Sequence, residues 1–141
     1  MQLTQTYTQL PEVFYAPVDP TPVDRPTPIV INDALAETLG LDPHWLHSEA
    51  GLAVLSGQTT LPQTQPIAMA YAGHQFGHWA GVLGDGRALL LGEQQDPQGQ
   101  RFDIQLKGAG PTPFSRNGDG RSSIGPVVRE YLGCEAMAAL G

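Results

Sequence analysis

The chain is poor in cysteine, in long apolar segments and in basic side chains. Cys134 is the only cysteine among 141 residues, so no internal disulfide can form, which fits a reducing compartment such as the cytoplasm. No apolar run approaches the length that crosses a bilayer, so we expect neither a membrane-spanning helix nor a membrane partner. The segment from Met1 to Thr6 lacks a basic stretch followed by an apolar core, which argues against a secretory signal.

Basic residues are both scarce and unevenly distributed. The chain has 7 Lys and Arg against 14 Asp and Glu, a net charge of −7, which argues against a nucleic-acid partner because such binding neutralises many phosphates. Arg25 is the single basic residue of 1–86, where eight residues are acidic, whereas residues 87–141 hold six basic and six acidic ones. A local basic cluster in an acidic chain predicts a small anionic ligand.

A glycine-rich tetrapeptide is present in two copies. Gly-Asp-Gly-Arg stands at residues 84–87 and again at 118–121, with Lys107 between the copies. Glycine lets successive N–H groups surround an anion, and each copy adds an arginine suited to phosphate oxygens. Asp-Gly is also a common turn signal, so one copy alone would indicate a turn. Two copies together with Lys107 favour a polyphosphate site.

Residues 1–66 read as an N-terminal arm followed by a helical extension. Six prolines within residues 1–30 exclude regular helix and indicate an extended arm. Asn32 is a good N-cap for a helix that Gly40 ends. Asp42 followed by Pro43 starts a second helix, whose apolar contacts we expect from Trp45, Leu46, Leu52 and Leu55. Residues 57–66 are polar and predict a loop.

Residues 67–141 predict an antiparallel hairpin followed by a helix. Residues 88–93 form an apolar strand, and residues 101–107 alternate, so that Lys107 lies on the polar face of the second strand. In the helix after residue 123, Glu130 falls on one face with Val127, Cys134 and Met137, an apolar stripe where an unpaired carboxylate is costly. We expect Lys107 to form an ion pair with Glu130. The alternative is that Glu130 pairs with Arg129 or lies at the rim of the apolar stripe.

A glycine-rich turn, a strand ending in lysine and a helix with an inward glutamate follow the order of a protein-kinase N-lobe. The usual Gly-x-Gly-x-x-Gly is absent, so an ordinary kinase is a poor match. The chain more closely resembles the selenoprotein O family, also called YdiU proteins, from about residue 11 to residue 141. The motifs are Tyr-Ala-Gly-His-Gln-Phe-Gly at 71–77, Leu-Gly-Asp-Gly-Arg at 83–87, Gln-Leu-Lys-Gly-Ala-Gly at 105–110, Thr-Pro at 112–113, Ser-Arg at 115–116 and Gly-Asp-Gly-Arg at 118–121.

This resemblance implies an α+β, protein-kinase-like N-lobe at 67–141 and an activity that moves AMP from ATP to hydroxyl side chains of proteins. It implies that Glu130 holds Lys107 as a supporting ion pair. Three roles stay open for Asp119: holding its loop, contacting the adenosine end, or approaching a metal. The ATP contacts that the resemblance implies are Gly84, Gly86, Arg87, Lys107, Asp119 and Gly120.

Members of that family are much longer than this chain. Their catalytic aspartate and the ligands of Mg²⁺ or Mn²⁺ lie in a C-lobe, so we expect an N-terminal fragment that is inactive in isolation and binds no metal itself. A non-catalytic nucleotide-binding module, and a protein-interaction module whose glycine loops are only turns, are the alternatives.

Two further groups of residues have structural interpretations. His74 and His78 have the spacing of metal ligands on a helix, but the neighbouring glycines oppose a helix and no third ligand is evident. We expect these histidines to be structural. Trp45, Trp79 and the leucines of 89–91 are expected in the core.

Overall fold

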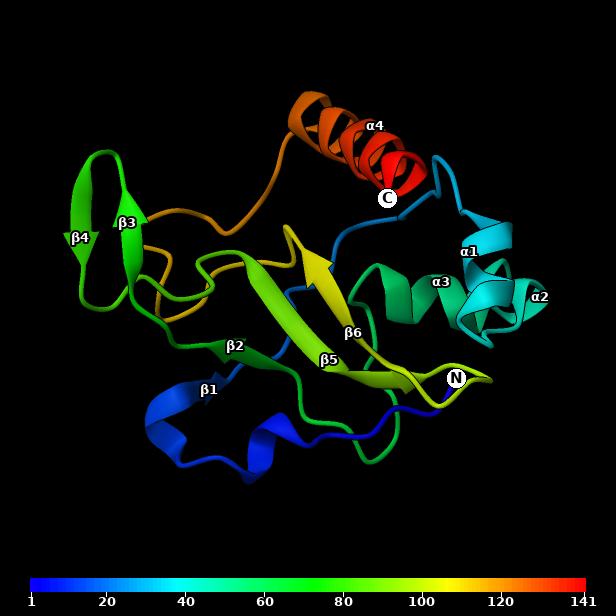
Figure 1. Cartoon of the computed structure of the whole chain (residues 1–141), viewed down its shortest axis with the longest axis horizontal. Helices are drawn as coiled ribbons and strands as arrows, with labels where there is room; N and C mark the ends of the chain where they lie inside the picture. Colours follow the sequence, from blue (N-terminus) through cyan, green and yellow to red (C-terminus); the bar gives the residue numbers. More distant parts are fainter.

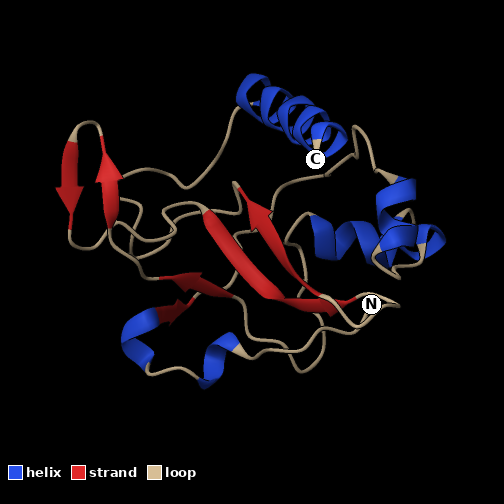
Figure 2. Ribbon diagram, viewed as in Figure 1, coloured by secondary structure: helices blue, strands red, loops and turns tan.

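A computed structural model describes all 141 residues and has the α+β architecture predicted from the sequence. Figure 2 shows a central sheet with short helices grouped at one end and a longer helix above it. No helix is both long and apolar enough to cross a membrane. The strands are β1 (Tyr15–Pro17), β2 (Ile67–Met69), β3 (Gly73–Gln75), β4 (His78–Ala80), β5 (Ala88–Gln95) and β6 (Arg101–Lys107). The helices are the 3₁₀ turns η1 (Tyr7–Gln9) and η2 (Glu12–Phe14), then α1 (Asp33–Thr38), α2 (Pro43–Leu46), α3 (Glu49–Leu55) and α4 (Ile124–Leu140).

The main sheet has four strands in the order β1-β2-β5-β6, and each neighbouring pair is antiparallel (Figure 1). The predicted hairpin of β5 and β6 is confirmed, with Ala88 opposite Lys107 at one end and Gln95 opposite Arg101 at the other. Its turn is closed by the Asp96 carboxylate, which accepts hydrogen bonds from the backbone N–H groups of Gln98 and Gln100. The sheet thereby places Lys107 directly beside the residue that follows the first Gly-Asp-Gly-Arg turn.

The N-terminal arm takes part in this sheet. β1 pairs with β2, and Thr4 and Glu93 exchange backbone hydrogen bonds of 3.0 and 2.8 Å alongside β5. Within residues 1–30, helical structure is limited to the short 3₁₀ turns η1 and η2, and the proline-rich residues that follow β1 contain no helix. Strands from both predicted ranges, 1–66 and 67–141, hydrogen-bond within one sheet. The division of the chain into these two parts stays a prediction.

Side-chain caps begin the short helices. Asn32 Oδ1 accepts from the N–H of Leu35, and Asp42 Oδ1 accepts from that of His44, so both predicted helix starts are confirmed. The second predicted helix is in fact two helices, because Ser48 caps a new one by accepting from the N–H of Gly51.

The core lies between the sheet and α3. Its buried cluster is Val54, Leu61, Ala68, Leu89, Leu91, Leu106 and Ala109. Trp45 packs against this cluster as expected, but the core prediction is wrong for Trp79, which is 63% exposed on the β3–β4 hairpin. Figure 1 shows that hairpin standing to one side of the main sheet, which agrees with the exposure of Trp79.

Helix α4 has no buried residue, so the predicted apolar stripe of Val127, Glu130, Cys134 and Met137 is wrong as a buried face. The helix begins after Ser123, as expected, but no other element packs closely on it. Side-chain hydrogen bonds from Lys107 to Glu130 and from Asn32 to Glu135 connect it to the rest of the chain.

Candidate functional site

The first glycine turn, residues 84–87, is fixed by its own aspartate. Asp85 is buried, and its carboxylate accepts hydrogen bonds from the N–H of Met69 at 3.0 Å and from the Tyr71 hydroxyl at 2.9 Å. Gly84 has φ +62°, and a Cβ on it would lie 2.3 Å from the Phe114 ring. The turn therefore needs glycine at 84 for its backbone conformation and for close packing.

The loop of residues 112–115 binds the carbonyl side of this turn. The Thr112 hydroxyl donates to the carbonyl of Asp85 at 2.5 Å, and the Ser115 hydroxyl donates to that of Gly86 at 2.6 Å. The backbone N–H groups of Gly86 and Arg87 have no acceptor within the chain. The carbonyls of Asp85 and Gly86 are thus occupied while two N–H donors of the turn are free, an arrangement that suits an anion.

The second turn, residues 118–121, is held differently. Asp119 Oδ1 accepts from the N–H of Arg121 at 2.9 Å, so of its three candidate roles the structure contains the loop-holding contact. The Arg121 guanidinium donates to the carbonyl of Gly108 at 3.3 Å and to that of Thr21 at 2.9 Å. Backbone carbonyls of the arm and of the strand end therefore hold Arg121, which is not among the implied ATP contacts.

The two copies of Gly-Asp-Gly-Arg differ in geometry. The left-handed residue is the first glycine of one copy, Gly84, and the second glycine of the other, Gly120, which has φ +67°. A Cβ on Gly120 would lie 1.8 Å from the Gly110 carbonyl oxygen. Asp119 is exposed where Asp85 is buried, and the N–H groups of Asp119 and Gly120 also lack acceptors. The same four residues are thus held by different contacts in the two copies, and each copy has two backbone N–H groups without an acceptor.

Lys107 and Glu130 form the predicted ion pair, in which Lys107 Nζ contacts Glu130 Oε1. Lys107 is opposite Ala88, and the N–H of Gly108 donates to the Arg87 carbonyl at 2.7 Å, so the lysine and the first turn are adjacent. The two side chains are 47% and 48% exposed. The contact was predicted correctly, whereas its burial in an apolar stripe was not.

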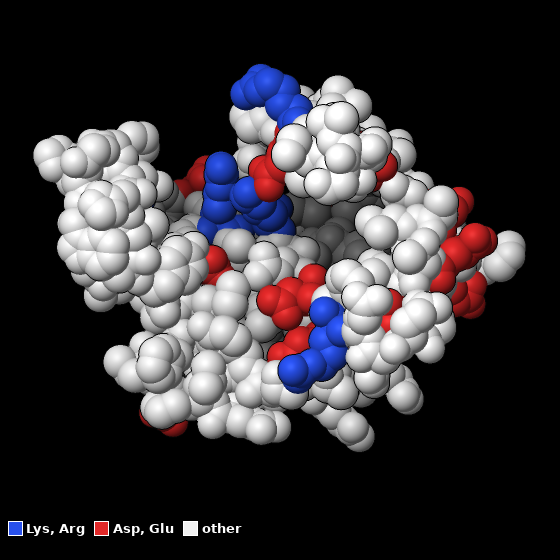
Figure 3. Space-filling view, in the orientation of Figure 1, with Lys and Arg blue, Asp and Glu red and all other residues white.

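Two cavities join these residues into one region. A cavity of about 390 Å³ is lined by both glycine turns, including Gly84, Gly86, Arg87, Asp119 and Gly120. A second cavity of about 370 Å³ is lined by Lys107 and Glu130, and it shares Tyr71, Gly86 and Arg87 with the first. Figure 3 shows Lys and Arg side chains gathered beside the hollow under α4. All six predicted contact residues thus lie in one place, and their binding of nucleotide stays a prediction.

Tyr71 was missed as a site residue by the sequence reasoning. It lines both cavities, and burial, followed by its hydrogen bond to Asp85, raises its pKa above the ordinary value of 10.0. Its hydroxyl therefore stays protonated and donates to the carboxylate. The only signal in the sequence is its place at the start of the 71–77 motif, since its partner is 14 residues away.

No group of three or more His, Cys, Asp and Glu side chains is arranged to hold a metal ion. His74 and His78 lie on the antiparallel β3–β4 hairpin rather than on a helix. The His74 ring packs edge-on against Trp79, with ring centroids 5.0 Å apart. This contact agrees with the structural interpretation of His74.

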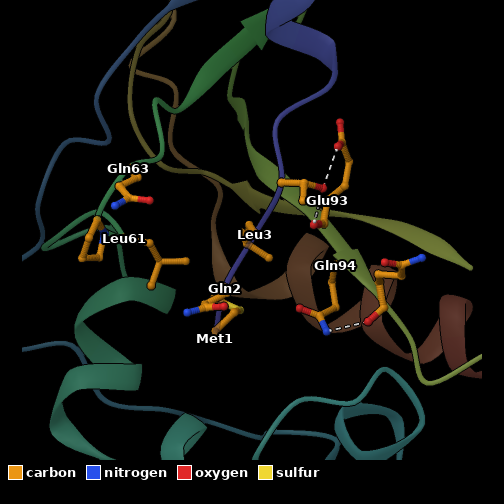
Figure 4. A pocket seen from close by; sticks show the side chains of 10 residues that line it. Met1, Gln2, Leu3, Leu61, Gln63, Glu93 and Gln94 are labelled. Atoms are coloured by element: carbon orange, nitrogen blue, oxygen red, sulfur yellow. Dashed lines mark hydrogen bonds between the residues drawn. The ribbon is translucent and has the colours of Figure 1, made fainter. Parts of the chain in front are cut away.

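The largest cavity, about 600 Å³, lies elsewhere, between the N-terminal residues and β5 (Figure 4). Its one charged side chain is Glu93, whose carboxylate is held by Thr4 and Thr6. Because no Lys or Arg lines this cavity, it does not suit a phosphate ligand, and the two smaller cavities are the candidate site.

Comparison with known proteins identifies the family of the chain. The sequence model of the family described as Protein adenylyltransferase SelO matches residues 1–141. A protein nucleotidyltransferase YdiU of Alkaliphilus metalliredigens is 57% identical over 139 residues, which are 99% of this chain and 28% of that protein. A YdiU protein of Nitrobacter hamburgensis is 55% identical over 141 residues, 100% of this chain and 28% of the relative. One of Bradyrhizobium sp. (strain ORS 278) is 60% identical over 136 residues, 96% and 28% respectively.

The chain thus spans about 28% of the length of these relatives. The family match covers every residue described above, including both glycine turns and the Lys107–Glu130 pair. The chain therefore belongs to the SelO family of protein adenylyltransferases.

Proposed function

We propose that this chain forms the ATP-binding part of a protein adenylyltransferase, which transfers AMP from ATP to Ser, Thr or Tyr hydroxyls of other proteins. The nucleotidyltransferase names of its relatives support the class of reaction. The observation that carries the proposal for this chain is the joint cavity region, where two glycine turns and Lys107 meet. We further propose that sheet and α4 together correspond to a kinase-like N-lobe, and that the protein acts in the cytoplasm.

The free backbone donors give the site its anion preference. Gly86 and Arg87 in the first turn, with Asp119 and Gly120 in the second, offer N–H groups without an acceptor in the chain. Phosphate oxygens accept hydrogen bonds from backbone N–H groups of this kind. In this proposal the two turns hold the phosphates from two sides.

Arg87 and Lys107 supply the charge. Arg87 makes no side-chain hydrogen bond or ion pair, so its guanidinium is available to a ligand at the junction of the two cavities. Lys107 is oriented by Glu130 and lies opposite Ala88, immediately after Arg87. Fixed cations of this kind stabilise charge that develops on phosphate oxygens during transfer.

A divalent cation, Mg²⁺ or Mn²⁺, neutralises phosphate charge in reactions of this class. The acidic and histidine side chains of this chain do not fit a metal site, because no three of them converge. We therefore assign no metal ligand here.

A module in which the glycine turns serve folding alone is the second candidate. Its support is the tight packing of Gly84 on Phe114 and of Gly120 on Gly110, which already explains two of the glycines. That interpretation gives no role to the unpaired guanidinium of Arg87.

Calorimetric titration with ATP separates the two candidates. We expect Arg87→Ala and Lys107→Ala each to weaken ATP binding by roughly tenfold or more, the loss of a charge-assisted hydrogen bond. Arg101→Ala is the matched control, since Arg101 lies at the opposite end of β6 from Lys107 and donates to Thr6 at 3.4 Å. Thermal melts of each variant check the fold. Equal ATP affinity in all variants would favour the folding-only candidate.

A further inference from the structure

A third arginine borders the same cavity. Arg116 lines the 390 Å³ cavity together with Arg87 and the second glycine turn. Its guanidinium donates to the side-chain oxygen of Gln75, the last residue of β3, and makes no ion pair. Gln75 is neutral, so the positive charge of Arg116 is left without a counter-charge.

The backbone at Arg116 is unusual. Arg116 has φ +49° and Asn117 has φ +70°, two consecutive non-glycine residues in the left-handed region. Each such residue costs conformational energy and persists only where its surroundings impose it. The surroundings are present: the Ser115 hydroxyl binds the Gly86 carbonyl, and the N–H of Gly118 donates to the Ser115 carbonyl at 2.8 Å. The loop therefore holds Arg116 beside the first glycine turn.

The charge balance of the cavity is positive. Three arginines line it, Arg87, Arg116 and Arg121, against one carboxylate, Asp119. Arg121 is committed to backbone carbonyls, and Asp119 accepts from the N–H of Arg121. Two guanidinium groups that no backbone carbonyl holds thus line one cavity of a chain whose net charge is −7.

We infer that Arg116 is a further phosphate-binding residue of the nucleotide site, held in place by Gln75. This inference rests on the proposed function. Arg87 lies at the junction of the two cavities and Lys107 in the second one, so Arg116 contacts the phosphate that lies farther from Lys107. A guanidinium can donate two hydrogen bonds to one phosphate while a third holds Gln75.

Two substitutions test Arg116 by different routes. Arg116→Ala removes the charge and is expected to weaken ATP binding roughly fivefold to tenfold, with adenosine binding unchanged because adenosine carries no phosphate. Gln75→Leu keeps the arginine and adds no charge to the cavity, but it removes the acceptor that holds the guanidinium. We expect a preferential loss of ATP affinity of roughly threefold to fivefold in Gln75→Leu, because the released side chain has to be ordered again on binding.

Calorimetry with ATP and adenosine on the wild type, both variants and Arg101→Ala distinguishes the outcomes. A merely structural Arg116 predicts that Gln75→Leu leaves ATP affinity within twofold of the wild type, and that result would overturn the inference even if Arg116→Ala does not fold. An ATP affinity of Arg116→Ala equal to that of the wild type would overturn this inference and leave the proposed function standing. Absence of ATP binding by the folded wild-type chain would overturn the proposed function, and the inference with it.

Discussion

Lys107, the last residue of β6, forms an ion pair with Glu130, in the second turn of α4. The pair connects the sheet to α4, a helix that has no buried residue. Each side chain is about half exposed, so water screens the attraction and the pair contributes little to stability. Its importance lies in orienting Lys107 towards the cavity that both residues line.

Glu130→Gln is therefore expected to separate stability from binding. The free energy of unfolding should change by less than about 1 kcal/mol, as for other exposed ion pairs. ATP affinity should fall, because Lys107 loses the carboxylate that orients it. Chemical denaturation and calorimetry of the same preparation measure the two quantities. A large loss of stability with unchanged affinity would show the pair to be structural.

Gly120→Ala should destabilise the loop before α4. A Cβ there would lie 1.8 Å from the Gly110 carbonyl oxygen, and alanine would have to adopt φ +67°. We expect a loss of roughly 1–3 kcal/mol from overpacking and backbone strain. Gly81→Ala is the matched control, because nothing lies within 4 Å of a Cβ at that position. Equal melting temperatures for the two variants would contradict the close approach of the two loops.

Acid should release the N-terminal residues from β5. Burial alone would raise the pKa of Glu93, but hydrogen bonds from the N–H and hydroxyl of Thr6, the hydroxyl of Thr4 and the N–H of Tyr7 outweigh it and hold the pKa below the ordinary 4.5. A carboxyl whose pKa is lower in the folded state stabilises fully above the unfolded value. The stabilisation is lost as the pH falls from about 4.5 through the folded pKa.

Melting temperatures measured between neutral and acidic pH check this dependence. The wild type should lose stability below about pH 4.5, and Glu93→Gln should show a shallower decline because it has no proton to take up. Parallel profiles for the two proteins would show that other carboxyl groups cause the acid sensitivity.

The 141-residue chain alone is expected not to transfer AMP. No three of its acidic or histidine side chains converge on a possible metal position, and nucleotidyl transfer depends on metal neutralisation of phosphate charge. Labelled ATP with Mg²⁺ or Mn²⁺ and a protein mixture tests this, with the Alkaliphilus YdiU protein as the positive control. Reproducible AMP incorporation by the pure chain would contradict the assignment of metal ligands to other residues.

Local signals predicted the local structure well. The caps at Asn32 and Asp42 and the β5–β6 hairpin depend on neighbouring residues, which the sequence displays directly. Ser48 was missed because its cap divides what reads as one apolar segment.

Contacts between distant residues were harder to predict. Lys107 and Glu130 were paired correctly because the expected strand and helix each left one charge without a partner. The contacts of Arg121 were not predicted, because its carbonyl partners, Thr21 and Pro22, lie about a hundred residues away. The exposure of Trp79 and of α4 depends on which surfaces meet, and residue periodicity carries no such information.

The central claim is that the two glycine turns bind the phosphates of ATP through their backbone. An NMR titration of the ¹⁵N-labelled chain with ATP follows each amide directly. We predict that the amide signals of Gly86, Arg87, Asp119 and Gly120, which have no acceptor in the chain, shift most strongly and saturate together. Shifts confined to the cavity near Glu93, with these four amides unchanged at saturating ATP, would contradict the claim.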